Sequence, residues 1–194
     1  MKRIIILPII VLFTMISFAQ TQPSEHLAFK GVPIDVTLNE YVSKMKQSGF
    51  TLISTEDGVA MLKGDFAAYK DCVVGVATLK QKDLVSKITV IFPERNTWSL
   101  LSSNYFSLKE MLTEKYGNPS EVVEKFDTYS EPKDDGSKMT YLKLDQCKYY
   151  SIYETDKGSI ELSIKQMDMR CLVMLAYYDK INGEIIKSKA MDDL

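Results

Sequence analysis

The stretch KYYSIYETDKGSIELSIKQMDMRCLVMLAYY, residues 148–178, decides the fold class of this chain. It contains three runs rich in β-branched and aromatic residues, with turns at 155–158 and 167–170 between them. Runs of this length that alternate with short polar turns predict consecutive antiparallel strands. The predicted strands are Lys148–Glu154, Ser159–Lys165 and Cys171–Tyr178.

Upstream of this stretch, an apolar stripe at helical spacing predicts a helix over 97–116, which Gly117 ends. A capping box at Ser107–Glu110 leaves two readings open, one long helix or two consecutive helices. Strand-like runs follow at Ser120–Tyr129 and Met139–Asp145.

The charged segment Glu131–Gly136 predicts a mobile loop between these two runs. Near the end of the chain, Asn182-Gly183 is typical of a tight hairpin turn. We therefore expect a last strand at Glu184–Ser188.

The first half of the chain has the same order of patterns. Thr37-Leu-Asn-Glu40 is a capping box, and the apolar stripe behind it predicts a helix over 38–48 that stops at Gly49. From Phe50 the apolar period changes to two, which predicts a meander of strands. The predicted strands are Phe50–Thr55, Val59–Phe66, Lys70–Lys80 and Leu84–Phe92.

A helix followed by a meander thus occurs twice. The sequence predicts an α+β protein of two tandem helix-plus-antiparallel-meander units, with helices packed on a largely antiparallel sheet. The predicted units are 27–93 and 94–190, and 191–194 form a tail. The match of Asp71-Cys72 with Gln146-Cys147 favours an internal duplication, and a coincidence between similar meanders is the alternative.

Residues 1–19 have the three parts of a signal peptide. Lys2-Arg3 is the basic start, Ile4–Phe18 is the apolar run, and small residues precede an expected cleavage between Ala19 and Gln20. A retained membrane anchor is the alternative, but a spanning helix needs about 20 apolar residues and this run is shorter. We expect a periplasmic or secreted protein with a polar leader at 20–26 and no stable membrane anchor after cleavage.

The order of helices and strands behind a signal peptide resembles the β-lactamase-inhibitor-protein-like architecture. The chain is also similar to exported proteins of Bacteroidetes-type bacteria in three short motifs, Gly31-Val-Pro-Ile34, Phe92-Pro93 and Lys115-Tyr-Gly-Asn-Pro119. The resemblance covers residues 30–190 and implies a sheet that presents one face to a partner protein. No inhibitory contact residue of that family maps onto this chain, so the resemblance does not carry over the activity.

The charge balance argues against nucleic acid as a partner. The chain has 24 Lys and Arg against 26 Asp and Glu, and removal of Lys2 and Arg3 with the signal peptide makes it slightly more acidic. A weakly acidic protein with dispersed lysines gains little attraction to phosphate backbones.

The chain lacks the residue patterns of common catalytic sites. His26 is the single histidine and belongs to the leader, where we expect it to be solvated, so His-based triads and zinc sites have no histidine to use. Ser43-Lys-Met-Lys46 matches the Ser-x-x-Lys string of serine β-lactamases, but both residues fall on the polar side of the predicted helix. We therefore expect no catalytic residues, no cofactor and no metal.

The chain has an odd number of cysteines, namely Cys72, Cys147 and Cys171. We expect buried free thiols, and one disulfide is the alternative. The turns at 155–158 and 167–170 place Cys147 and Cys171 opposite the region of Lys165 on the intervening strand. Two strand spacings amount to about 9.6 Å, beyond the reach of a disulfide. The sequence thus predicts that these two cysteines do not form a bridge.

Tyrosine is concentrated in the second half of the chain. We expect Tyr150 and Ile152 to share the core face with Ile160, Leu162, Ile164, Leu172, Met174 and Ala176. The opposite face then mixes apolar, aromatic and polar groups, as protein interfaces do. It is either covered by another element or free for a partner. The candidate partner-binding residues are Tyr149, Tyr153, Val173, Leu175 and Tyr177.

These patterns together favour an exported, non-catalytic binding or inhibitor-like protein that acts on another protein. The alternative is a carrier that holds a small apolar ligand between the helices and the sheet, for which the 10 methionines and the clustered aromatics are the only indication.

Overall fold

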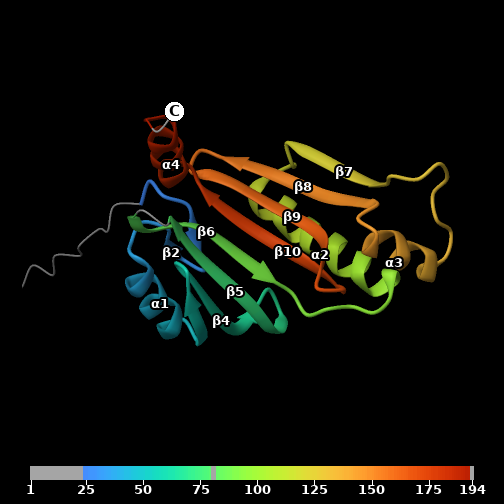
Figure 1. Cartoon of the computed structure of the whole chain (residues 1–194), viewed down its shortest axis with the longest axis horizontal. Coiled ribbons are helices and arrows are strands. Elements are labelled where there is room, and N and C mark those ends of the chain that lie inside the picture. Colours follow the sequence, from blue (N-terminus) through green and yellow to red (C-terminus); the bar gives the residue numbers. More distant parts are fainter. Residues whose placement is uncertain (1–23, 80–81, 193–194) are drawn as a thin grey trace, which may run out of the picture.

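The computed structural model describes residues 24–79 and 82–192, which build four helices on a large antiparallel sheet (Figure 1). The helices are α1 (Leu38–Gln47), α2 (Trp98–Tyr116), α3 (Asp135–Lys143) and α4 (Lys180–Asp192). The strands are β1 (Ala28–Phe29), β2 (Val32–Pro33), β3 (Thr51–Glu56), β4 (Val59–Phe66), β5 (Tyr69–Leu79), β6 (Lys82–Ile91), β7 (Glu121–Phe126), β8 (Cys147–Thr155), β9 (Gly158–Met167) and β10 (Arg170–Asp179). The predicted α+β class is confirmed.

The main sheet has eight strands in the order β3-β4-β5-β6-β10-β9-β8-β7, and all neighbours are antiparallel. Each set of four strands is a meander, and the last strand of the first set, β6, pairs with the last strand of the second, β10. Cys72 lies on the third strand of its set, whereas Cys147 lies on the second of the other. The two cysteines therefore do not occupy equivalent places, and a duplication of the predicted units stays a hypothesis.

Two predicted helices form as expected. At the start of α1 the Thr37 hydroxyl accepts a hydrogen bond from the Glu40 amide, and the Glu40 carboxylate accepts one from the Thr37 amide. The predicted capping box is therefore present. In the second half α2 is one uninterrupted helix, and Ser107 is an exposed residue within it. Ser43 and Lys46 are exposed on α1, as the helical spacing predicts.

Two predicted strands and the end of one predicted loop are wrong, because acidic residues begin helices there. Residues 131–134 are irregular, as predicted. Asp134 accepts the amide and the hydroxyl of Ser137 and starts α3, so Asp135-Gly136 is helix, and the expected strand Met139–Asp145 does not form. Its apolar residues, Met139 and Leu142, are three apart and face the core along a helix.

The expected strand Glu184–Ser188 is also helix. Asp179 accepts the backbone amide of Asn182 at 2.9 Å, which begins α4 where a hairpin turn was expected. The Asn182 side chain is buried and donates to the carbonyls of Ile34 and Val85, both at 2.7 Å. These tertiary hydrogen bonds override the local turn preference of Asn-Gly.

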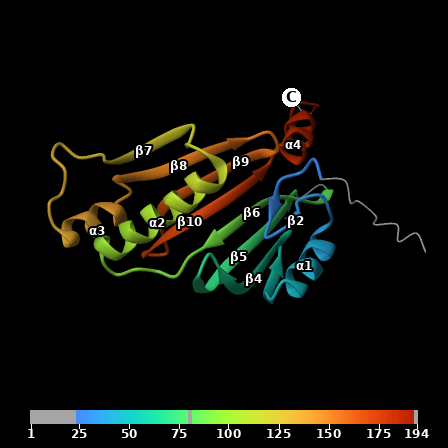
Figure 2. The same cartoon turned by 180° about the vertical axis from the view of Figure 1, so that it is seen from behind.

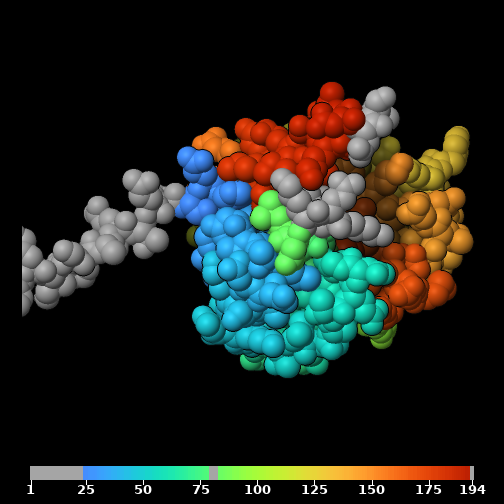
Figure 3. Space-filling model, turned by 60° about the vertical axis from the view of Figure 1, so that its left-hand side comes forward, coloured from blue at the N-terminus to red at the C-terminus, as the bar shows by residue number. Residues whose placement is uncertain are grey.

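The start of the described chain and α4 lie at the same end of the molecule. The space-filling view shows the N-terminal segment in blue against α4 in red (Figure 3). The predicted signal peptide and the expected cleavage site lie outside the described residues. Among the helices of the described part, none has both the length and the apolar character needed to span a membrane.

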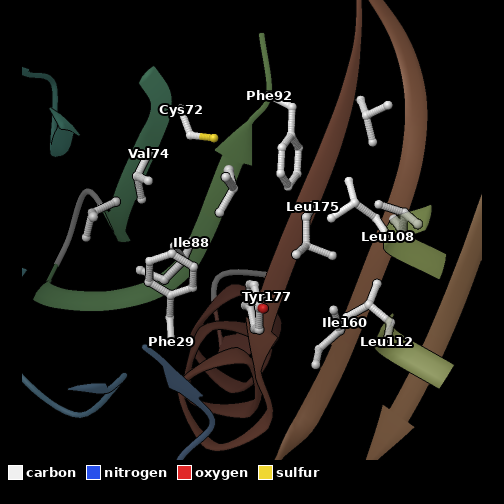
Figure 4. Packing of buried hydrophobic residues seen from close by; sticks show 14 of the residues in the cluster. Phe29, Cys72, Val74, Ile88, Phe92, Leu108, Leu112, Ile160, Leu175 and Tyr177 are labelled. Carbon is white, nitrogen blue, oxygen red and sulfur yellow. The ribbon is translucent and has the colours of Figure 1, made fainter. Parts of the chain in front are cut away.

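The hydrophobic core lies between the helices and one face of the sheet. One row of this face crosses six strands, since cross-strand partners share a face. The row consists of Ala60, Val76, Ile88, Tyr177, Ile160 and Tyr153, all buried in one cluster. Leu108 and Leu112 of α2 lie over Ile160 and Leu175 in this cluster (Figure 4).

Candidate partner-binding face

The opposite face of the sheet, which we call the open face, is formed by the residues that alternate with the core rows. None of its residues belongs to the core cluster that the described helices cover. Figure 2 shows α2 in front of β8, β9 and β10, whereas in Figure 1 these strands lie in front of α2. The helices of the second half therefore lie on the other side of the sheet, although Leu172, Ser163 and Ala176 on the open face are themselves buried.

A partly apolar row runs across the centre of the open face. It consists of Lys63, Val73, Ile91, Met174, Ser163, Tyr150 and Val123, one residue from each strand between β4 and β7. Val73, Ile91 and Met174 are neighbours in this row and are partly exposed. With a strand spacing of about 4.8 Å, the row is about 29 Å long.

A second, parallel row adds further apolar groups and two carboxylates. It consists of Met61, Gly75, Thr89, Ala176, Glu161, Ile152 and Glu121. The sulfur of Met61 lies 3.5 Å from the place where a Cβ on Gly75 would be, so the Met61 side chain leans over this glycine. The missing side chain of Gly75 thus leaves space for Met61 on the open face.

Polar contacts hold the side chains at the border of the open face. The Tyr150 hydroxyl donates to a Glu121 oxygen at 2.6 Å, and this hydrogen bond raises the pKa of Tyr150. The Lys87 amine lies 4.7 Å from the centre of the Tyr178 ring, in range for a cation–π contact. A mixture of apolar centre and oriented polar groups is the usual composition of a protein interface.

Lysines follow the border of the open face at the start of β8. Lys125 and Lys148 are cross-strand neighbours, and both contact Asp127, at 3.3 and 2.5 Å. The Lys148 hydrogen bond is the main cause of the lowered pKa of Asp127. Lys165 on β9 is exposed and pairs across the strands with Leu172 on β10.

The five residues predicted to bind a partner lie on the other face, and that prediction is wrong. All of them are buried: Tyr149, Tyr153, Val173, Leu175 and Tyr177. The helices and the N-terminal segment cover them. Tyr149 packs edge-on against Trp98 at 4.9 Å between ring centres, and Tyr177 against Phe29 at 5.3 Å. Burial raises the pKa of Tyr149 to about 12.

The physical reason for this error is the register of the two hairpins. Thr155 pairs with Gly158 across a two-residue turn, which places Tyr153 opposite Ile160. Met167 pairs with Arg170 across the next two-residue turn, which places Ile160 opposite Tyr177. Cross-strand partners share a face, so the tyrosines join Ile160 in the core. The residues expected beside Ile160 are on the open face: Tyr150, Ile152, Leu172, Met174 and Ala176.

Under α2, the buried tyrosines form hydrogen bonds that fix the helix to β7 and β8. The Tyr105 hydroxyl lies 2.7 Å from the Ser151 hydroxyl and donates to Glu124 at 3.2 Å, and the Lys109 amine reaches the same Glu124 oxygen at 2.5 Å. The Tyr153 hydroxyl donates to the Lys109 carbonyl at 3.0 Å. Burial raises the pKa of Tyr105, so it remains a neutral hydrogen-bonding group.

A second polar cluster involves the single histidine, which is not solvated as expected. His26 donates through Nδ1 to Asp179 at 3.0 Å, and the Leu27 amide donates to the other Asp179 oxygen at 2.8 Å. The Asp179 side chain is fully buried, and the His26 side chain is 21% exposed. Nearby, the Lys157 amine donates to the Ser24 carbonyl at 2.6 Å. The cluster ties the leader to Asp179, the last residue of β10, directly before α4.

The cysteines agree with the sequence prediction. All three are buried and free, and Cys171 pairs with Gln166 on β9, the strand that separates it from the strand of Cys147. Burial raises the pKa of Cys72 to about 11 and that of Cys147 to about 12. Thiols with such pKa values are poor nucleophiles at neutral pH.

One surface hollow is lined by charged groups that pair with one another. It has a volume of about 620 Å³ and lies where β3, β4 and β5 meet the end of α1. In it the Lys63 amine contacts Asp71 at 2.9 Å, and Lys30 donates to the Asp65 carbonyl at 3.3 Å. Within residues 24–79 and 82–192, no three His, Cys, Asp or Glu side chains are grouped closely enough to hold a metal ion.

Comparison of the chain with family models, with curated proteins and with solved structures gave no match. The functional argument therefore depends on the two faces of the sheet alone.

Proposed function

We propose that this chain is a non-catalytic binding protein that engages another protein through the open face of its sheet. The observation that supports this proposal is the row Val73, Ile91 and Met174, which is apolar, partly exposed and not covered by the described helices. Apolar side chains at the centre of a sheet face are stabilised when a partner removes them from water. The Tyr150–Glu121 and Lys87–Tyr178 contacts supply polar groups around them.

The size of the open face favours a protein over a small molecule. A row about 29 Å long is comparable to a standard protein interface, whereas small ligands occupy enclosed hollows that bury most of their surface. On the other face, Leu108 and Leu112 of α2 pack directly against Ile160 and Leu175 (Figure 4). This packing gives no support to the alternative of a carrier with a ligand between helices and sheet.

The compartment of the partner follows from the predicted signal peptide. If residues 1–19 direct export, the partner is a periplasmic or extracellular protein. An inhibitor of such a protein would act by occupying its surface, with the apolar row of the open face against the partner.

The proposal is tested by affinity capture from a periplasmic extract of the source cells. Met174→Glu places a charge in the middle of the apolar row and should abolish capture, because a buried unpaired charge opposes association. The matched control is Leu100→Glu on α2, where the wild-type side chain is 56% exposed, and it should retain capture. Circular dichroism and urea unfolding of both variants show whether the fold is kept.

Capture that survives Met174→Glu in a folded variant contradicts the proposal. Equal loss of capture in both variants contradicts it as well, because the effect is then not specific to the open face.

A further inference from the structure

The edge strand β7 has backbone groups available for a further strand. Among the described strands it pairs with β8 alone and ends the sheet on one side. The Asp127 amide donates to the Gln146 carbonyl on the β8 side at 3.0 Å. Backbone N–H and C=O groups point to alternate sides along a strand, so those of the odd-numbered residues of β7 point toward β8. Val122 and Glu124 therefore turn their N–H and C=O groups away from the sheet.

The two edges of the sheet differ in how well they can accept another strand. On the β3 edge a bulge between Leu52 and Ser54 interrupts the regular ladder. Bulges of this kind are a common protection of sheet edges. The β7 ladder is regular from Glu121 to Phe126, and Val122 on this strand is 42% exposed. Of the two edges, β7 is the one suited to pairing.

We propose that β7 pairs in antiparallel fashion with β7 of a second copy of this chain, centred on Val123. This dimer goes beyond the proposed function and does not depend on it. A two-fold axis through the strand centre makes the contact closed and self-complementary. The pairing joins two eight-stranded sheets into one continuous sheet.

The charges of β7 select this register. With Val123 opposite Val123 of the second copy, Glu121 lies opposite Lys125 at both ends of the contact. These side chains share the open face. Glu121, which accepts from Tyr150, and Lys125, which contacts Asp127, thus meet across the contact at both ends of the valine pair. In the same register Val122 lies opposite Glu124 on the helix side, and Lys109 already holds that carboxylate.

The register centred on Glu124 is disfavoured by repulsion. A shift of the contact centre by one residue, to Glu124, keeps the outward backbone groups matched but places Glu124 opposite Glu124. It also places Glu121 opposite Asp127, so like charges meet at three points. A shift in the other direction, to Val122, also matches the outward backbone groups but places Glu121 opposite Val123, so it forms no Glu121–Lys125 pair. The charges therefore favour the register centred on Val123.

Helix α2 lies mainly over the inner strands. It packs on β8, β9 and β10, and its Tyr105 and Lys109 reach β7 at Glu124, on the helix side of the sheet. The dimer extends the central row of the open face, because Val123 ends that row in each copy. The joined faces therefore form one surface with two-fold symmetry.

Sedimentation velocity over a range of protein concentrations tests the proposal. The wild-type chain should form dimers as concentration rises. Glu121→Lys and Lys125→Glu should each raise the dimer dissociation constant about thirtyfold, since each turns two attractive pairs into repulsive ones. An equimolar mixture of the two variants should dimerise again, because each supplies the charge that the other lacks. Glu56→Lys on the β3 edge is the matched control and should dimerise like the wild type.

Val122→Pro gives an independent measurement, because it removes an outward N–H without changing charge and should also weaken the dimer. A wild-type chain that stays monomeric up to about 1 mM overturns the proposal. So does a dimer that both charge variants retain, or a mixture of the two that remains monomeric while each variant is folded. If Glu56→Lys abolishes the dimer, the contact lies on the β3 edge, and this result also overturns the proposal.

Discussion

Replacing Asp179 with alanine removes the acceptor of three hydrogen bonds at a place that water does not reach. The Asp179 carboxylate is fully buried and accepts from His26, from the Leu27 amide and from the Asn182 amide. The variant leaves two backbone amides without a partner, each at about 1–3 kcal/mol, and it removes the N-cap of α4. We expect a loss of about 4 kcal/mol in the free energy of unfolding, in the range for a broken buried pair.

Urea unfolding followed by circular dichroism measures this loss. With a slope of about 2 kcal/mol per M, the midpoint should fall by about 2 M. His26→Ala should cost less than Asp179→Ala, because the histidine is partly exposed and contributes one of the three donors. Asp35→Ala changes an exposed carboxylate next to Ile34, which Asn182 contacts, and should leave the midpoint unchanged. An Asp179→Ala variant that loses less than about 1 kcal/mol would refute the buried cluster.

The remaining predictions concern the core, the thiols and the acid limb of stability. Replacing Tyr149, Tyr153 and Tyr177 together with serine should abolish the folded circular dichroism spectrum, because each large buried aromatic contributes about 3–5 kcal/mol; a folded triple variant would put these residues on the surface. A thiol reagent should find almost no reactive cysteine in the native protein at pH 7 and three in urea, and fewer than three without reductant would reveal a disulfide. Hydrogen bonds from Ser137 lower the pKa of Asp134 from 3.8, so its contribution to stability is complete above that pH and is lost as the pH falls through the lowered value. Asp134→Ala should therefore differ from the wild type in urea unfolding at pH 7, and this difference should shrink below pH 3.8; a constant difference contradicts the role of the carboxylate as the cap of α3.

Local patterns predicted the elements whose stability is local. Helix α1 has its capping box and its buried stripe within one segment, and the strands of the first meander have a clear period of two. The three strands between Lys148 and Tyr178 were predicted close to their observed bounds for the same reason. In these elements nothing distant overrides the local preference.

The wrong predictions concern residues whose conformation depends on groups far away in the chain. Asn182-Gly183 is a strong hairpin signal, but Asn182 bonds to Ile34 and Val85, which a local pattern does not reveal. His26 likewise gained its partner, Asp179, from the other end of the sequence. The N-caps Asp134 and Asp179 were the local signals that could have indicated α3 and α4.

In the candidate site, a one-residue shift in strand register decides which residues face the core and which face the surface. The predicted turns at 155–158 and 167–170 are the observed ones, and applied strictly they pair Ile160 with both Tyr153 and Tyr177. Grouping Ile160 with Tyr150 instead shifts the strand by one residue and exchanges the faces. Both faces of β10 are rich in apolar residues, so composition alone did not reveal the error.

Site-specific crosslinking tests the central claim, that the open face is the binding surface, most directly. A photoreactive side chain at Met174 lies in the apolar row, and one at Leu100 lies on the exposed side of α2. After illumination in a periplasmic extract, the open-face account predicts one discrete crosslinked protein from position 174 and none from position 100. The same crosslinked protein from position 100 and nothing from position 174 would contradict it.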